Sequence, residues 1–265
     1  MKDYKIKDLQ TIIKNNITAN HEIIFIAGNL ANLGYSDSDN KLDLLNSLNE
    51  SIFLANKDIT IMTQTMSFQI CNTDIPFERN TWSNLGAFGN YLLREKGSVR
   101  SLHPFASYTA LGKNANICHT STPFAYGISS PYDNMLKHDN ILMLSIGMTP
   151  NLTCSIIHHA EFNIHVPYRY IKEFNHPVKF ENKITYKNFY LHVLYKEYCE
   201  LKRNLNLKLF HYFKNKGGII SEIPLGKNTL YFYDYKKFYN TCIEYLLKDV
   251  YAWMDKEPEI KPYRY

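Results

Sequence analysis

The chain has 265 residues, of which 45% are hydrophobic and 21% are charged, as in ordinary folded proteins. This length allows one large domain or two small ones. The longest strongly apolar stretch, Ile141–Met148, is far shorter than the ~20 residues of a membrane span. Residues 1–20 contain no continuous apolar stretch of the kind found in secretion signals. We therefore expect a cytoplasmic protein without a membrane span.

The net charge of +5 comes from scattered lysines, with no block of five or six like charges. It indicates a lysine-rich surface more than a dedicated site for phosphate, and neither a basic stripe nor a recognition motif predicts a nucleic-acid partner. The 21 tyrosines could stack on a sugar or a base, or could reflect an AT-rich genome. The five cysteines form no CxxC pair, which argues against disulfides and zinc and favours reduced thiols.

Hydrophobic spacing predicts the secondary structure along the first two thirds of the chain. Apolar residues at three- and four-residue intervals indicate helices, and short or alternating apolar runs indicate strands. In chain order, the sequence predicts a helix over 3–18, a strand over 22–27, a helix over 39–51 capped by Asp37 or Ser38, a strand over 58–65, a helix over 85–96 and a strand over 141–146.

This alternation predicts an α/β fold, a mixed central sheet flanked by helices with several parallel connections. After residue 180 the pattern changes to alternating aromatic and polar residues over 186–201 and a break at 216–218. A strand over 229–233, a helix over 234–254 and an extended tail over 257–262 follow. No repeat or linker divides the chain, so we expect one domain over 1–265, with a motif-rich part (1–170) and a sparser part (171–265).

Residues 156–161 read Ile-Ile-His-His-Ala-Glu. If this segment is helical, His158 and Glu161 share one face, and the carboxylate could raise the pKa of the imidazole and fix its tautomer, as a general base requires. An isolated HxxE more often marks histidines satisfied by local hydrogen bonds. Zinc binding is excluded by the spacing, since His159 points to another face and no HExxH is present.

A second motif, residues 100–107, combines a cation, hydroxyl groups and a turn-forming proline. A guanidinium beside hydroxyls and turn amides suits a phosphate or pyrophosphate, although an ordinary polar turn has the same composition. A third segment, residues 121–131, is a turn-rich loop with two prolines; such loops are usually functional, and a surface Ω-loop is the alternative.

The order of these motifs resembles the aminoglycoside 3-N-acetyltransferase family over roughly residues 20 to 170. The resemblance rests on four ordered segments: 86–107, 110–115, 123–131 and 141–161, the last ending in His-x-Ala-Glu. Family members commonly have His-Ser or Ser-Ser where this chain has Gly28-Asn29. His159 stands where leucine or tyrosine is usual.

The resemblance implies an antibiotic N-acetyltransferase-like fold and acetyl-CoA as donor, with no metal. His158 would be the general base and Glu161 the carboxylate that orients it or contacts the amine. The loop after the first strand, Gly28, Asn29 and Leu30, would border the pantetheine arm. One wall of the CoA channel would consist of polar residues of the second motif, Arg100, Ser101, His103 and Ser107. The other wall would consist of Phe124 and Ser129 from the third segment.

Arg169 and His159 are expected to contact the substrate, in a part of the chain where tyrosines are frequent. A polycationic aminoglycoside favours a carboxylate-lined pocket, whereas this chain is basic, so we expect a nucleotide-linked amino sugar for surface-polysaccharide biosynthesis in a bacterium. Aminoglycoside resistance is the alternative, and a non-catalytic sugar- or nucleotide-binding relative is the alternative of another class. The sequence does not decide whether backbone amides or Ser155 donate hydrogen bonds to the oxyanion. It does not decide the oligomeric state either, and a homodimer is one arrangement.

Overall fold

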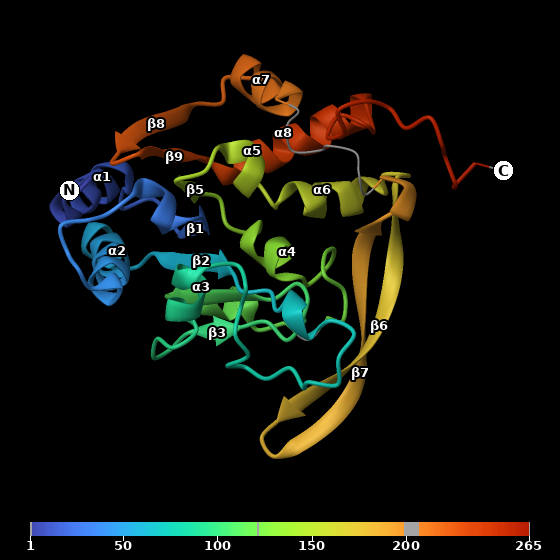
Figure 1. Ribbon diagram of the computed structural model, residues 1–265. Helices are drawn as coiled ribbons and strands as arrows, with labels where there is room; N and C mark the ends of the chain where they lie inside the picture. The colour runs from blue at the N-terminus through green and yellow to red at the C-terminus, as the bar shows by residue number, and fades with distance from the viewer. Residues whose placement is uncertain (1, 121, 199–206, 265) are drawn as a thin grey trace.

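A computed structural model describes residues 2–120, 122–198 and 207–264. Its centre is a seven-stranded sheet with the order β3-β4-β2-β1-β5-β9-β8 (Figure 1). The strands are β1 (Ile23–Gly28), β2 (Thr60–Gln64), β3 (Val99–Arg100), β4 (Tyr108–Gly112), β5 (Ile141–Ile146), β8 (Ile220–Leu225) and β9 (Asn228–Asp234). The predicted strands over 22–27, 58–65, 141–146 and 229–233 correspond to β1, β2, β5 and β9.

Parallel pairing is limited to the middle of the sheet, where β1 lies between β2 and β5. β4 pairs with β2, and β9 with β5, in antiparallel orientation, so the parallel connections are fewer than expected. The carboxyl ends of the three parallel strands lie at one edge of the sheet. The loops that follow Gly28, Gln64 and Ile146 therefore start close together, as in other open α/β sheets that place their sites at such an edge.

Helices cover both faces of the sheet (Figure 1). Because side chains alternate along a strand, Ile23 and Phe25 of β1 enter one apolar core and Ile24 and Ile26 the other. The second core is completed by α1 (Ile6–Asn16), α2 (Lys41–Ala55) and α3 (Ala87–Leu92), and the first by α4 (Pro131–Met135), α6 (Ile157–Ile164), α7 (Lys208–Asn215) and α8 (Tyr235–Lys248). α5 (Pro150–Thr153) links β5 to α6. The 3₁₀ helices are η1 (Leu30–Leu33), η2 (Phe68–Ile70), η3 (Ala115–Cys118) and η4 (Lys196–Tyr198).

The predicted helices exist, with shifted ends. The cap of α2 is Asn40 rather than Asp37 or Ser38, because the Asn40 side chain accepts the hydrogen bond from the Leu42 amide. α3 ends at Leu92, four residues before the predicted limit. α8 begins after the Asp234 cap and stops at Lys248, so 249–254 are not helical. No helix among the described residues is long and apolar enough to cross a membrane.

A long antiparallel hairpin, β6 (Arg169–Phe180) and β7 (Lys183–Leu194), forms a separate sheet that the sequence pattern did not predict as a pair. It begins beside the end of α6 and runs along one side of the molecule (Figure 1). Single bridges join it to the body, from Phe77 to Val178 and from Phe124 to Tyr190. The expected division near residue 170 falls at the start of β6. Of the earlier segments, Ser121 and residues 199–201 lie outside the described part of the chain.

Candidate active site

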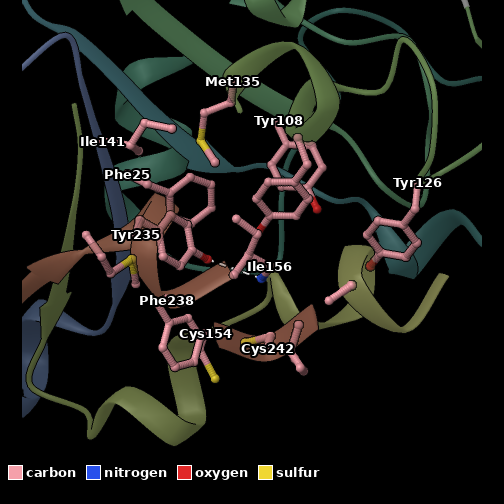
Figure 2. Close-up of a cluster of buried hydrophobic side chains, with 14 of the residues drawn as sticks. Phe25, Tyr108, Tyr126, Met135, Ile141, Cys154, Ile156, Tyr235, Phe238 and Cys242 are labelled. Atoms are coloured by element: carbon pink, nitrogen blue, oxygen red, sulfur yellow. Dashed lines mark hydrogen bonds between the residues drawn. The ribbon is translucent and has the colours of Figure 1, made fainter. Parts of the chain in front are cut away.

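The histidine and glutamate of the HxxE motif meet on α6. Nδ1 of His158 lies 2.6 Å from Oε2 of Glu161, and the glutamate side chain is fully buried while 32% of the histidine side chain is exposed. Helical spacing of three residues places the two groups on one face, as the sequence predicts. The helix starts without a side-chain cap; instead, the Ile156 amide donates to the Tyr235 hydroxyl at 3.1 Å within the aromatic core shown in Figure 2.

Two adjacent residues hold the buried carboxylate from the other side. The Tyr168 hydroxyl donates to Oε1 of Glu161 at 2.7 Å, and Nε of Arg169 lies 2.9 Å from Oε2. Burial alone raises the pKa of a carboxyl group, but the charge of Arg169 and the contacts of His158 and Tyr168 outweigh it and hold the pKa of Glu161 at about 2. Glu161 is therefore an ionised, fixed acceptor at neutral pH.

This geometry assigns the proton of the neutral imidazole. A nitrogen lone pair would repel a carboxylate oxygen at 2.6 Å, so Nδ1 of His158 carries the hydrogen and donates it to Glu161. The lone pair is then on Nε2, the other ring nitrogen, where it can accept a proton from a substrate. The arrangement is that of a general base supported by a carboxylate.

Arg169 belongs to this support. Its Nη1 donates to the His192 carbonyl at 3.2 Å, its Nη2 lies 3.1 Å from Nδ1 of His158, and only 7% of its side chain is exposed. Arg169 thus pairs with Glu161, a role that the sequence did not indicate, and its expected contact with the substrate stays a prediction. Tyr168 was missed altogether; its only signal was its position directly before Arg169.

His159 points to the other side of α6 and is 1% exposed. Its Nδ1 accepts from the Gly127 amide at 3.3 Å, and its Nε2 lies 3.2 Å from the Asn163 side chain. Burial lowers the pKa of His159 to about 4, so the ring is neutral and embedded. Both ring nitrogens already have protein partners, which favours a packing role over the substrate contact we expected.

A cavity of about 420 Å³ lies at the carboxyl edge of the sheet. Gly28, Asn29 and Leu30 line it together with the first turns of α2 and α3, and their contact with the pantetheine arm stays a prediction. Gly28 has a φ of 118°, and a Cβ there would lie 2.2 Å from the Ile146 carbonyl oxygen. Only glycine allows β1 and β5 to approach so closely at this edge.

The loop over 100–107 turns inward and does not line this cavity. Arg100, 7% exposed, donates to the carbonyls of Thr65, Arg79 and Thr81, and to the hydroxyls of Ser67 and Ser107. All three guanidinium nitrogens thus have partners within the protein.

Three other polar residues of the same loop are also buried. Ser101 accepts from the Tyr108 amide at 3.0 Å, and Ser107 donates to the Thr65 carbonyl at 2.8 Å. His103 is 4% exposed, and burial lowers its pKa to about 4. These contacts stabilise the β3–β4 connection. They give no direct support to the prediction that Arg100, Ser101, His103 and Ser107 line the CoA channel.

The two predicted residues of the third loop are exposed. The Phe124 ring stacks on Tyr190 at 4.8 Å between centroids, where the loop joins β7. Ser129 has a φ of 62°, and its amide donates to Asp133 at 2.9 Å. The structure thus brings His158, Glu161 and Arg169 together, groups Gly28, Asn29 and Leu30 at the cavity, and leaves Phe124 and Ser129 on the loop surface.

The fold is a mixed α/β sheet, and α6, which follows β5 and α5 in the chain, carries a partly exposed histidine in contact with a buried carboxylate. The family model for aminoglycoside 3-N-acetyltransferase matches residues 58–247, and the chain belongs to this family. The chain is therefore a CoA-dependent acetyltransferase by family, with the mixed α/β fold that the sequence predicts. No curated relative matches the chain by sequence.

Solved structures share the fold over nearly the whole chain. A histidine-to-alanine mutant of the aminoglycoside acetyltransferase AAC(3)-IVa, in complex with a gentamicin, is 18% identical, covers 97% of this chain and 93% of its own, and has a TM-score of 0.73. The binary complex of AAC-IIIb with CoASH is 16% identical, with coverages of 96% and 99% and a TM-score of 0.74. YokD from Bacillus subtilis is 14% identical, with coverages of 92% and 99% and a TM-score of 0.72. These identities establish the fold alone.

Proposed function

We propose that this chain transfers the acetyl group of acetyl-CoA directly to a primary amine of an amino sugar, with His158 as the general base. The observation that carries the proposal is the 2.6 Å contact between Nδ1 of His158 and the buried, ionised Glu161. A non-catalytic sugar-binding relative has no need for a partly exposed imidazole whose tautomer is set by a buried carboxylate.

The chemical step needs a free amine. Nε2 of His158 accepts one proton from the acceptor's ammonium, and the nitrogen lone pair attacks the thioester carbonyl. As the C–S bond breaks, the imidazolium of His158 protonates the leaving thiolate, and the attacking nitrogen releases a second proton to solvent as the amide forms. Glu161 stays ionised and stabilises the imidazolium that forms, and a positioned base of this kind contributes roughly 10²–10⁴-fold in rate. Ser155, whose hydroxyl oxygen lies 2.5 Å from that of Tyr132, is a candidate donor to the oxyanion, with backbone amides as the alternative.

The cavity at Gly28, Asn29 and Leu30 is our candidate for the pantetheine arm. The cavity opens at the carboxyl end of β1, and its lining carries one cation, Lys41, and one carboxylate, Asp39, which already pairs with Lys2. Acetyl-CoA would supply the activated acetyl group there. Arg100, Ser101, His103, Ser107, Phe124 and Ser129 remain candidates from the resemblance only.

We propose a nucleotide-linked amino sugar of surface-polysaccharide biosynthesis as acceptor, because the chain is basic. An aminoglycoside is the alternative, favoured by the gentamicin-bound structure of the same fold. The test is thiol release from acetyl-CoA against a panel of nucleotide-linked amino sugars and aminoglycosides, with identification of the acetylated product. Thiol release that does not rise with any amine, or that His158→Ala leaves unchanged, would contradict the proposed base.

A further inference from the structure

A cavity of about 350 Å³ lies where α6 ends and the β6–β7 hairpin begins. Its size is at the lower end of the range for small-molecule sites, roughly 300–1,000 Å³. The lining, which we call the aromatic cavity, includes Phe162, Arg169, Tyr170, His192, Tyr195 and Tyr263. These residues come from one helix, both hairpin strands and the C-terminal segment, so only the folded chain assembles them.

The aromatic cavity adjoins the proposed base. Arg169 lines it and also contacts both Glu161 and His158. Phe162 follows His158 by four residues on α6, so the two side chains share one helix face, roughly 6 Å apart along the axis. The lining continues beyond Phe162 to Tyr195 and Tyr263, so an acceptor whose amine reaches His158 can place a second group, separated from the amine by a linker, in the aromatic cavity.

The aromatic cavity is lined mainly by aromatic side chains, and some of these rings contact each other. Tyr170 and Tyr195 lie 4.9 Å apart between centroids, and the Phe162 ring meets His192 edge-on at 5.4 Å. Such faces favour a planar or apolar ring, and any nucleobase can stack on an aromatic side chain.

The charge of the lining opposes a polycation. Among the described residues, no aspartate or glutamate lines the aromatic cavity, and the nearby Glu161 already has Arg169, His158 and Tyr168 as partners. Burial and the neighbouring Arg169 lower the pKa of His192 to about 4, so this ring is neutral at pH 7. An aminoglycoside would bring several ammonium groups to a surface that offers them aromatic faces and a guanidinium.

From the cavity's lining and its place beside Arg169 and His158, we infer that the aromatic cavity binds the nucleobase of a nucleotide-linked amino sugar while the amine lies at His158. This inference rests on the proposed function and deepens it by naming where the acceptor's nucleotide lies and which rings recognise it.

The direct test measures binding of uridine and guanosine diphosphates to the full chain by calorimetry. Saturating CoA is included because CoA carries its own adenosine diphosphate group. We expect Tyr170→Ala to weaken binding by roughly tenfold or more and Tyr170→Phe to restore it. The matched control is Tyr186→Ala on β7, 58% exposed and outside the aromatic cavity, which should bind as the wild type does.

Kinetics separate this inference from the proposed function. With a nucleotide-linked amino sugar as acceptor, Tyr170→Ala should raise the KM for that acceptor and leave the KM for acetyl-CoA unchanged. Absence of nucleotide binding, or equal binding by Tyr170→Ala and wild type, would overturn the inference. Nucleotide binding that depends on Tyr170, without acetyl transfer to any amine, would support the aromatic cavity and refute the acetyltransferase proposal instead.

Discussion

The hydroxyl of Tyr168 lies 2.7 Å from Oε1 of Glu161, seven residues earlier in the chain. His165 makes this contact possible: with a φ of 56° it ends α6 in the left-handed conformation and turns the chain back. The Val166 amide then bonds to the Glu161 carbonyl, and the next residues return to the carboxylate. One local reversal therefore supplies both partners of Glu161 that lie outside its helix.

Replacing His158 with alanine should lower kcat by roughly 10²–10⁴-fold, because the attacking amine loses its proton acceptor. The KM for acetyl-CoA should change little, and the free energy of unfolding should fall by about 1.5–3 kcal/mol, because the buried Glu161 loses a hydrogen bond. Steady-state thiol release and denaturant titration check both. His211→Ala on α7, an exposed position, is the matched control; a similar loss in that variant would indicate a general effect on the fold.

Tyr168→Phe should lower kcat by roughly tenfold and destabilise the protein by about 1.5–3 kcal/mol, since it removes a buried hydrogen bond to a charged acceptor. Tyr233→Phe is the control: that hydroxyl is buried without a hydrogen-bond partner among the described residues, so its removal should be neutral. Urea unfolding and the pH profile of kcat measure the effects. If Tyr168→Phe changed stability alone and left kcat and its pH profile as in wild type, Tyr168 would only support the fold.

Glu161 predicts a specific loss of stability in acid. Its pKa is lowered to about 2 in the folded chain, so its stabilisation is complete above the unfolded pKa near 4.5 and is lost as the pH falls toward 2. Between pH 5 and pH 3 the wild type should lose about 2 kcal/mol more than Glu161→Gln. At pH 7 the variant should itself be less stable by about 3–5 kcal/mol, since the Arg169 charge is left buried. If the free energy of unfolding fell equally in the wild type and in Glu161→Gln between pH 5 and pH 3, the ionised state of Glu161 would be contradicted.

Arg100→Lys should destabilise the chain on the order of 3 kcal/mol, because an ammonium cannot reach the carbonyls and hydroxyls that the guanidinium bridges. The KM for acetyl-CoA should stay within about twofold under conditions where the variant is folded. Arg94→Lys, at an exposed position, should have neither effect. A raised KM with unchanged stability would instead support Arg100 as the CoA anchor that the resemblance implies.

The sequence by itself determined the strands β1, β2, β5 and β9, the helices α1, α2, α3 and α8, the family and the His158–Glu161 pair, because local periodicity and helical spacing are properties of neighbouring residues. It could not show that Arg100 turns inward, since the same residues suit an anion site or a buried turn, and only the acceptors around them decide. Nor could it show that Tyr168 and Arg169 hold Glu161, or that β6 and β7 complete an aromatic cavity with the C-terminal segment. Those relationships join residues through chain reversals and long-range pairing, and tertiary packing alone selects the partners of a buried charge.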